Sequence, residues 1–520
     1  MVVKSNSPGD FDKRISGLRR SLPQIIAVTV KNILLLAYGM TIGFPTILIP
    51  SLSGGNPHEK IVLEPEAISW IGSANYLSVP LGCLLSGAIT QPIGRRRAMQ
   101  LVTTPFLASW LLYHFSTEAW QVFLALCLTG FAGGLLEAPT LTYLAEVTTP
   151  NLRGVLASTS TVSIIAGILI EFMLGTFLHW RNVALISCSV PVLACLLLFC
   201  VPESPYWLIS KNRLEDARKS TAWLRGWLEV EDVEKEFNEL VEQLKRTSRS
   251  QAAEEASEEG QSTFNKKLKK SRQNLSMYTK KPFLWPFGLV SFVFALGHFS
   301  GMTTLQTYAV NIFATLKAPI DKYYATIILG IAEALGCILS SILVHFVGKR
   351  KMNFFSLTGT AVCFFVVATY AYLIDVKALQ IASKHNELDT ENRSWLPLTF
   401  LVGAAFFSHS GIRILPWMLI GEVYYSKIRA TASGFSGAMS YIFGFLSNKV
   451  FFSMIASFTL PETEGKTLFQ ITEHFAGGPK LDNKVNNFVR MRKMKKKNLE
   501  NGRVNKAFDG EDGEQANSKF

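Results

Sequence analysis

The sequence predicts an all-α membrane protein, and three observations support this. Hydrophobic residues make up 48% of the 520 residues and charged residues only 18%, whereas a soluble protein has about 25% charged residues. The apolar residues occur in blocks such as residues 183–201, which contain no charge and match the ~17–25 residues that cross a bilayer. The segments between blocks gather basic residues, for example Arg95–Arg97. The positive-inside rule assigns such segments to cytoplasmic loops.

The positions of the charges and cysteines indicate which partners to expect. The net charge of +13 is divided among short segments between apolar blocks, so we expect a lipid bilayer as partner and no nucleic acid. All seven cysteines lie inside apolar blocks, and none are paired at metal-ligand spacing. We therefore expect buried thiols, no metal and no cofactor. Because no nucleophile–base spacing stands out, we do not expect an enzyme.

The apolar blocks predict two transmembrane halves separated by a polar loop. The spans expected in the first half are 23–50, 66–91, 99–116, 119–144, 155–178 and 182–201. Those expected in the second half are 284–312, 323–346, 353–375, 395–421 and 432–458. The expected organisation is a cytoplasmic N-terminal tail (1–21), an N-terminal transmembrane half (22–202), a cytoplasmic loop (203–283), a C-terminal transmembrane half (284–460) and a basic tail (461–520).

Three motifs recur in the same order in both halves. They are Gly94-Arg95-Arg96 and Gly348-Lys349-Arg350, then Glu146 and Glu422 with Arg153 and Arg429 seven residues on, then Pro202-Glu203 and Pro461-Glu462. Parallel repeats of six helices form one large class of transporter, with the solute held between the halves near the bilayer midplane. The repeat therefore predicts two six-helix halves, and the resemblance described below makes this a major facilitator-type fold.

The repeated motifs carry opposite charges at the expected cytoplasmic helix ends. Carboxylates and guanidinium groups form charge-assisted, often bidentate pairs, and we expect such pairs to latch the two halves in one conformation. The alternative is that the basic residues only set topology. The expected gate residues are Arg95, Arg96, Glu146, Arg153, Glu203, Arg350, Glu422, Arg429 and Glu462.

The second half is too short for six spans. Between Arg153 and Pro202 lie 48 residues, but between Arg429 and Pro461 only 31, too few for two helices of ~20 residues and a turn. We expect the last span to be missing, which leaves about eleven. An odd number would place the basic tail outside, against the positive-inside rule. An internal deletion in a twelve-span transporter explains this, and a pair of short re-entrant helices is the alternative.

These motifs resemble the sugar porter family of the major facilitator superfamily, over residues 22–475, and within it the insect facilitated trehalose transporter-like branch. The residues on which the resemblance rests are Gly94-Arg95-Arg96, Glu146 with Arg153-Gly154, Pro202-Glu203-Ser204-Pro205, Ser300-Gly301, Pro416-Trp417, Glu422 with Arg429, and Pro461-Glu462-Thr463-Glu464. The resemblance implies sugar contacts on the fifth, seventh and tenth spans. Members are uniporters or proton symporters.

The positions that this resemblance assigns to sugar contacts are mostly altered. A fifth-span glutamine falls on Thr161, paired seventh-span glutamines fall on Gly297 and His298, and a tenth-span Gly-Pro falls on Arg413-Ile414. Small polar residues also hold helices together without any solute. The expected solute contacts are Thr161, His298, Ser300, Thr303, Thr304, Gln306, Arg413 and Trp417.

Four charged residues, Glu137, Glu171, Glu333 and Arg413, fall deep inside apolar blocks. Ionisable groups at membrane depth are costly and normally face a cavity or a partner. Our hypothesis is that Arg413 pairs with Glu137 or with another of these acids. The alternative is that Arg413 reaches towards one membrane face.

The expected function is facilitative transport of a sugar, trehalose or a hexose, by alternating access in a multi-pass protein of the cell membrane. The resemblance implies that proton-coupled members carry an acid in the first span, and this span contains none, so the resemblance favours uniport. A proton-linked carrier of another polyol or organic solute and a non-transporting solute sensor on the same fold are the alternatives. Asn392 begins a glycosylation sequon in a loop expected outside. The sequence leaves the oligomeric state open.

Overall fold

The computed structural model describes the chain as helices joined by short connections. The described residues are 17–54, 59–256, 281–373, 394–424 and 426–459, and none of them forms a strand. The chain divides into two compact units, Met1–Ser453 and Met454–Phe520. The second unit lies almost wholly outside the described residues, so the fold below is that of the first.

The first half contains the six expected spans. Proline at the start of α3 and α6 fits the first helical turn, where its missing N–H leaves no bond unmade. Gly94 separates α3 from α4 with a φ of 107°, which side chains rarely adopt. The helices are α2 (Gly17–Leu52), α3 (Pro65–Ile93), α4 (Arg95–Phe115), α5 (Ala119–Val147), α6 (Pro150–Phe177), α7 (Trp180–Ser187) and α8 (Ser189–Leu198), of which the last two together form one span.

The second half differs from the sequence prediction at two spans, which are broken and not continuous. The helices are α13 (Lys281–Phe299), α14 (Met302–Thr307), α15 (Ala309–Thr315), α16 (Lys322–Val347), α17 (Lys349–Leu373), α18 (Trp395–His409), α19 (Leu415–Val423) and α20 (Ser426–Thr459). The expected span 284–312 is interrupted at Gly301, and the expected span 395–421 at residues 410–414.

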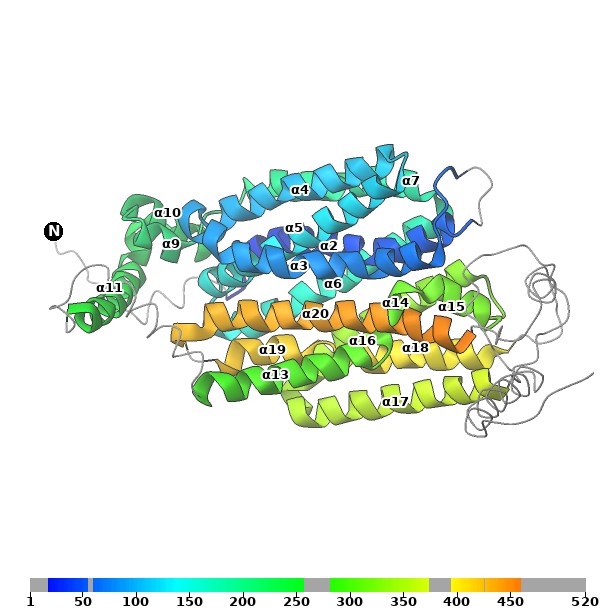
Figure 1. Ribbon diagram of the computed structural model, residues 1–520. Coiled ribbons are helices and arrows are strands. Elements are labelled where there is room, and N and C mark those ends of the chain that lie inside the picture. The colour runs from blue at the N-terminus through cyan, green and yellow to red at the C-terminus, as the bar shows by residue number, and fades with distance from the viewer. Residues whose placement is uncertain (1–16, 55–58, 257–280, 374–393, 425, 460–520) are drawn as a thin grey trace, which may run out of the picture. The chain divides into compact units, whose positions relative to one another are not determined.

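The polar stretch after the first half forms a small helical cap. It contains α9 (Pro205–Ser210), α10 (Leu214–Leu224), a 3₁₀ turn (Glu231–Val233) and α11 (Glu234–Ala256). Its core is formed by Trp207, Leu208, Ala217 and Phe237. Figure 1 shows these helices gathered at one end of the long helices.

The apolar surface of the long helices fits a bilayer. Among the described residues, seven helical segments are long and apolar enough to cross a membrane, and α13 and α18 contain shorter apolar segments. Large aromatic side chains point outward, including Phe346, which is 82% exposed, and Phe365, which is 74% exposed. Exposed apolar surface of this kind is typical of contact with lipid. The protein is a multi-pass membrane protein.

A single helix, α20, occupies the short interval at the end of the second half. Helix α20 runs for 34 residues without a break, or about 50 Å at 1.5 Å per residue. In the first half the corresponding interval contains α6, α7 and α8. Among the described residues this interval of the second half therefore holds one helix where the first half holds two spans, and the total of about eleven spans stays a prediction.

A buried ion pair ties the loop after α2 to the turn between α6 and α7. Arg181 donates from Nη2 to Glu59 Oε1 at 2.8 Å, and the Trp180 indole donates to Glu59 Oε2 at 2.9 Å. His179 Nε2 lies 3.5 Å from the same carboxylate. The Glu59 side chain is 3% exposed and that of Arg181 24%. These contacts fix the predicted outer end of the first half.

The environment of Glu59 makes this contact sensitive to acid. Burial acts to raise the pKa of Glu59, but the hydrogen bonds from Arg181 and Trp180 outweigh it, and the pKa falls below its ordinary value of 4.5. A carboxyl with a lowered folded pKa stabilises the fold above its unfolded pKa. That stabilisation is lost as the pH falls below 4.5 and through the folded pKa.

We predict that Glu59→Gln lowers the free energy of unfolding by about 1.5–3 kcal/mol, because hydrogen bonds to a charged group are lost. The melting temperature of the purified protein in detergent at neutral pH measures this change. Glu64→Gln is the matched control, because Glu64 is exposed on the same loop. As the pH falls below 4.5, Glu59→Gln loses less stability than the native chain. Equal acid sensitivity in both would contradict the assignment.

Candidate functional site

The first helix break lies between α13 and α14. Gly301 has a φ of 89°, the left-handed conformation that glycine adopts without strain. Its Cβ, if present, would also touch the Phe364 ring at 3.4 Å. After the break the chain continues as the short helix α14. This helix places Thr303, Thr304 and Gln306 in the protein interior, each at most 3% exposed.

The second break, between α18 and α19, is held by a serine from α17. Ser356 Oγ donates to the Phe407 carbonyl at 2.7 Å and accepts from the Ile412 N–H at 2.9 Å. Backbone groups freed inside a membrane must find such partners, because no water is available. A Cβ on Gly411 would lie 2.6 Å from the Ser356 Cβ, so the close approach needs glycine. The break carries Arg413.

Side chains from the two breaks form one polar cluster. The Arg413 guanidinium donates to Thr303 Oγ1 at 2.7 Å, and its Nη1 lies 3.4 Å from His298 Nδ1. The His298 ring spans Thr303 Oγ1 and Ser440 Oγ, at 3.0 Å each. The cluster thus joins α13, α14, the α18–α19 break and α20. Arg413 is partly exposed, whereas His298 is buried.

Further hydrogen bonds link this region to the first half. Gln306 Nε2 donates to Glu333 Oε2 at 2.8 Å, and the Gln306 carbonyl accepts from Thr46 on α2 at 2.7 Å. Asn448 Nδ2 donates to the Gly72 carbonyl on α3 at 2.8 Å and to Thr307 Oγ1 at 3.1 Å. The broken helix α13–α15 therefore contacts both halves.

The other predicted solute contacts lie around this cluster or outside it. Trp417 packs edge-on against Phe294, with ring centroids 5.0 Å apart, and lies 6.0 Å from the Tyr441 ring. Thr161 is partly exposed on α6. Ser300 donates to the Gly297 carbonyl of its own helix at 2.8 Å, so its hydroxyl is already used. Which of these residues touch a solute remains a prediction.

The expected ion pair of Arg413 is not formed in this conformation. In the part of the chain that the structure describes, Arg413 bonds to neutral side chains and no acid lies within ion-pair distance of it. Glu333 is bonded to Gln306 instead. Glu171 is fully buried and accepts from Ser187 Oγ at 3.3 Å. Glu137 is partly exposed on α5.

Sequence reasoning missed a second polar cluster in the first half. Lys31 is 2% exposed and donates to Ser160 Oγ at 2.7 Å. Next to it, Asn32 donates to Thr159 Oγ1 at 2.8 Å. These contacts join α2 to α6. The signal was a lysine and an asparagine inside the first apolar block, because such residues at membrane depth need partners.

At the predicted cytoplasmic end, Arg95 and Glu146 form a bidentate pair. The two N–H···O distances are both 3.0 Å, and the side chains are 8% and 18% exposed. Ser204 also donates its hydroxyl to Glu146. Helices α4 and α5 pack directly against each other. The pair joins α4 to α5 within the first half, and a latch between the two halves stays a prediction.

Glu203 caps the start of α4 from a distant part of the sequence. Its carboxylate accepts the backbone N–H groups of Arg95 and Arg96 at 3.0 Å each, and that of Ser204 at 2.9 Å. The first N–H groups of a helix have no partner within the helix, and the helix dipole favours a negative charge there. The Arg96 side chain donates to the Val201 carbonyl at 2.9 Å. The repeated motifs thus build one compact joint.

The remaining predicted gate residues are either exposed or not fully described by the structure. Arg153 is exposed and donates to the Ala145 and Thr148 carbonyls at 2.9 and 3.2 Å, so it caps α5 and does not pair with Glu146. Arg350 is exposed at the start of α17. Glu422 and Arg429 lie on α19 and α20, but their side chains fall outside the description. Glu462 and Asn392 lie outside the described residues.

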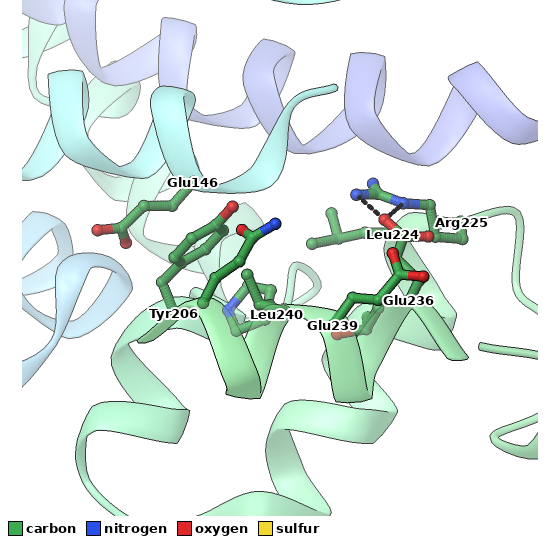
Figure 2. A pocket seen from close by; sticks show the side chains of 10 residues that line it. Glu146, Tyr206, Leu224, Arg225, Glu236, Glu239 and Leu240 are labelled. Carbon is green, nitrogen blue, oxygen red and sulfur yellow. Dashed lines mark hydrogen bonds and ion pairs between the residues drawn. The ribbon is translucent and has the colours of Figure 1, made fainter. Parts of the chain in front are cut away.

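A pocket opens beside this joint, between the end of α5 and the cap helices. Figure 2 shows Glu146, Tyr206, Arg225 and Glu236 around it. Arg225 holds Glu236 through two donors, at 2.8 Å from Nε and 2.7 Å from Nη2. This pair ties α11 to the end of α10. The pocket therefore lies between the cap and the Arg95–Glu146 joint.

Repeated motifs in two sets of spans, with broken helices that carry polar residues at membrane depth, are typical of secondary transporters. Residues 55–456 match the family described as "Sugar (and other) transporter". The chain belongs to this sugar transporter family.

Several curated relatives are transporters. The chain is 29% identical over 477 residues to the facilitated trehalose transporter Tret1 of Drosophila virilis, covering 87% of the chain and 49% of that relative. It is 27% identical over 477 residues to Tret1 of Polypedilum vanderplanki, covering 87% of the chain and 88% of that relative. The chain spans about half the length of the Drosophila relatives it matches.

Solved structures confirm the major facilitator fold. The E. coli xylose transporter XylE in a partially occluded inward-open conformation matches with a TM-score of 0.62 at 15% identity, over 84% of this chain and 95% of that one. The proton:xylose symporter XylE bound to 6-bromo-6-deoxy-D-glucose matches with a TM-score of 0.64 at 18% identity, over 84% and 89%. At these identities the likeness concerns the fold alone.

We predict that Arg95→Ala destabilises the protein by about 3–5 kcal/mol, because it leaves a largely buried carboxylate without its partner. Arg153→Ala removes exposed caps only and should cost about 0.3–1 kcal/mol. Thermal unfolding in detergent compares these two arginine substitutions at the same end of the helices. Equal losses from both would contradict the buried joint.

Proposed function

We propose that this chain mediates facilitative transport of a sugar, trehalose or a hexose, by alternating access. The observation that carries the proposal is the polar cluster at the two helix breaks, where His298, Thr303 and Arg413 meet. Discontinuous helices near the midplane are where transporters of this kind bind solute. Family membership and relatives named facilitated trehalose transporters support the choice of a sugar.

The residues around the cluster suit a polyol. Hydroxyl, imidazole and guanidinium groups donate and accept hydrogen bonds. The ring of Trp417 adds an aromatic face that packs on the apolar side of a sugar ring. Uniport is favoured because residues 23–50 contain no acid. A proton-linked carrier is the second candidate, since Glu171 and Glu333 are fully buried at membrane depth and a carboxyl there is suited to a proton relay.

We predict saturable uptake of labelled trehalose or glucose in oocytes that express the chain at the surface, unchanged between external pH 5.5 and 7.5. Uptake that rises at the lower pH would favour the proton-linked carrier. Solute binding without uptake would favour the sensor. Surface biotinylation establishes that the chain has reached the membrane in each case.

We predict that Trp417→Phe lowers uptake about tenfold, which corresponds to ~1.4 kcal/mol of lost contact with the solute. Trp285→Phe is the matched control, because Trp285 is 76% exposed on the lipid-facing side of α13. Initial uptake rates, normalised to surface protein, give the comparison. The same uptake rate for both variants would show that Trp417 does not contact the solute.

A further inference from the structure

Glu137 and Arg413 occupy equivalent positions in the two halves. Glu137 lies nine residues before Glu146, and Arg413 lies nine residues before Glu422, in the motif that both halves share. The fourth span and the tenth span therefore carry opposite charges at the same point of the repeat. Parallel repeats related by an axis along the membrane normal place such points at the same depth.

The carboxylate of Glu137 lies against helices of the second half. A Cβ built on Gly437 of α20 would lie 3.8 Å from Glu137 Oε1 and 3.9 Å from the ring of Trp417 on α19. The side chain is partly exposed. It accepts no hydrogen bond or ion pair from any residue within the described ranges. Because its neighbours belong to both halves, its exposed part faces the space between them and not lipid.

The guanidinium of Arg413 has donors left over. Its Nη1 is bonded to Thr303 and approaches His298, both neutral hydrogen-bond partners. Arg413 is partly exposed, and its remaining N–H groups have no partner among the residues that the structure describes. Arginine presents five donors in a rigid fork. Those left over are placed to bind an acceptor that enters from the space between the halves.

The other ionisable groups at this depth are sealed from a solute. Glu171 and Glu333 are 0% exposed and bonded to Ser187 and Gln306. Lys31 is 2% exposed and bonded to Ser160. Of these five charged side chains, only Glu137 and Arg413 have surface open to the interior.

We propose that Glu137 and Arg413 form a charge-balanced clamp, one arm from each half, which binds the solute from both sides and selects solutes without net charge. This proposal rests on the proposed function and adds which solutes the site selects. A sugar hydroxyl donates to the carboxylate, and another accepts from the guanidinium. A neutral solute leaves the two fixed charges balanced. An added carboxylate or ammonium on the solute unbalances them where the dielectric constant is low.

The test compares three hexoses as competitors of labelled glucose or trehalose: neutral glucose, anionic glucuronate and cationic glucosamine. For the native chain, glucose competes at least tenfold better than either charged sugar. Glu137→Gln leaves a net positive site, so glucuronate should compete about tenfold better relative to glucose. Glucosamine should not gain in this variant. Arg413→Gln leaves a net negative site and gives the opposite shift.

Conservative variants separate the clamp from a merely structural role. Glu137→Asp and Arg413→Lys keep the charge and should keep the preference for neutral sugars, even where the rate falls. Glu137→Gln with Arg413→Gln should restore that preference, because the site is neutral again. Arg246→Gln, on the exposed side of α11, is the control that leaves selectivity unchanged. Where a variant fails to reach the surface, ligand-induced thermal shifts of the purified protein give the same ratios.

The outcomes distinguish the clamp from the proposed function. Neutral-sugar uptake with the same charge selectivity in all variants overturns the clamp and leaves sugar transport standing. If both single variants compete equally less well for all three sugars, the clamp is also overturned, because the two residues then have only structural roles. A native chain at the surface that neither binds nor takes up any sugar overturns both. Opposite shifts in the two single variants support the clamp.

Discussion

A backbone or charged group at the centre of a bilayer has no water to bind, and this constraint governs the whole structure. Where α18 gives way to α19, the freed carbonyl and N–H are both bonded to Ser356 of α17. Where α13 gives way to α14, the His298 carbonyl accepts from the Ser447 hydroxyl of α20. Each break is thus tolerated because neighbouring helices supply its partners, and each break in turn brings polar side chains to membrane depth.

The same constraint divides the charged residues into two groups. Lys31, Glu171 and Glu333 are sealed and bonded to neutral side chains, so they fix helices against one another. Glu137 and Arg413 keep open surface at symmetry-related positions. At the predicted cytoplasmic end, water is close, and the chain uses full ion pairs there, as between Arg95 and Glu146. Exposure at membrane depth, and not depth itself, therefore separates the charges that hold the fold from the two that we propose meet a solute.

The sequence was sufficient to predict most of the spans and their order. Apolar runs and basic loops follow directly from the hydrophobic interior and the charged faces of the bilayer. The spacing between the repeated motifs also predicted a shortened second half, and α20 occupies the short interval as one helix. The breaks at Gly301 and at residues 410–414 were not predicted, since hydropathy does not register a local turn within an apolar block. A turn of this kind depends on partners such as Ser356, which is more than 50 residues away in sequence.

The candidate site was predicted only in part. His298, Thr303 and Arg413 were named individually, but their mutual contacts depend on how two broken helices meet. Arg153 was expected to pair with a carboxylate, yet it caps the end of α5. Its partners are carbonyl groups, which every residue carries and which therefore leave no signal in the sequence. Lys31 was visible in the first apolar block, and only its partner Ser160 required the structure.

We propose that the chain transports its solute by alternating access, in which the two halves rock about the site between them. The most direct measurement is a pair of spin-label distances in the purified protein, with and without glucose or trehalose. One pair, at Arg97 and Arg350, reports the predicted cytoplasmic ends, and the other, at Thr117 and Tyr324, reports the opposite ends; all four side chains are exposed. We predict that solute shifts the two distance distributions in opposite directions. Distances that stay fixed, or that change in the same direction, would contradict alternating access in this chain.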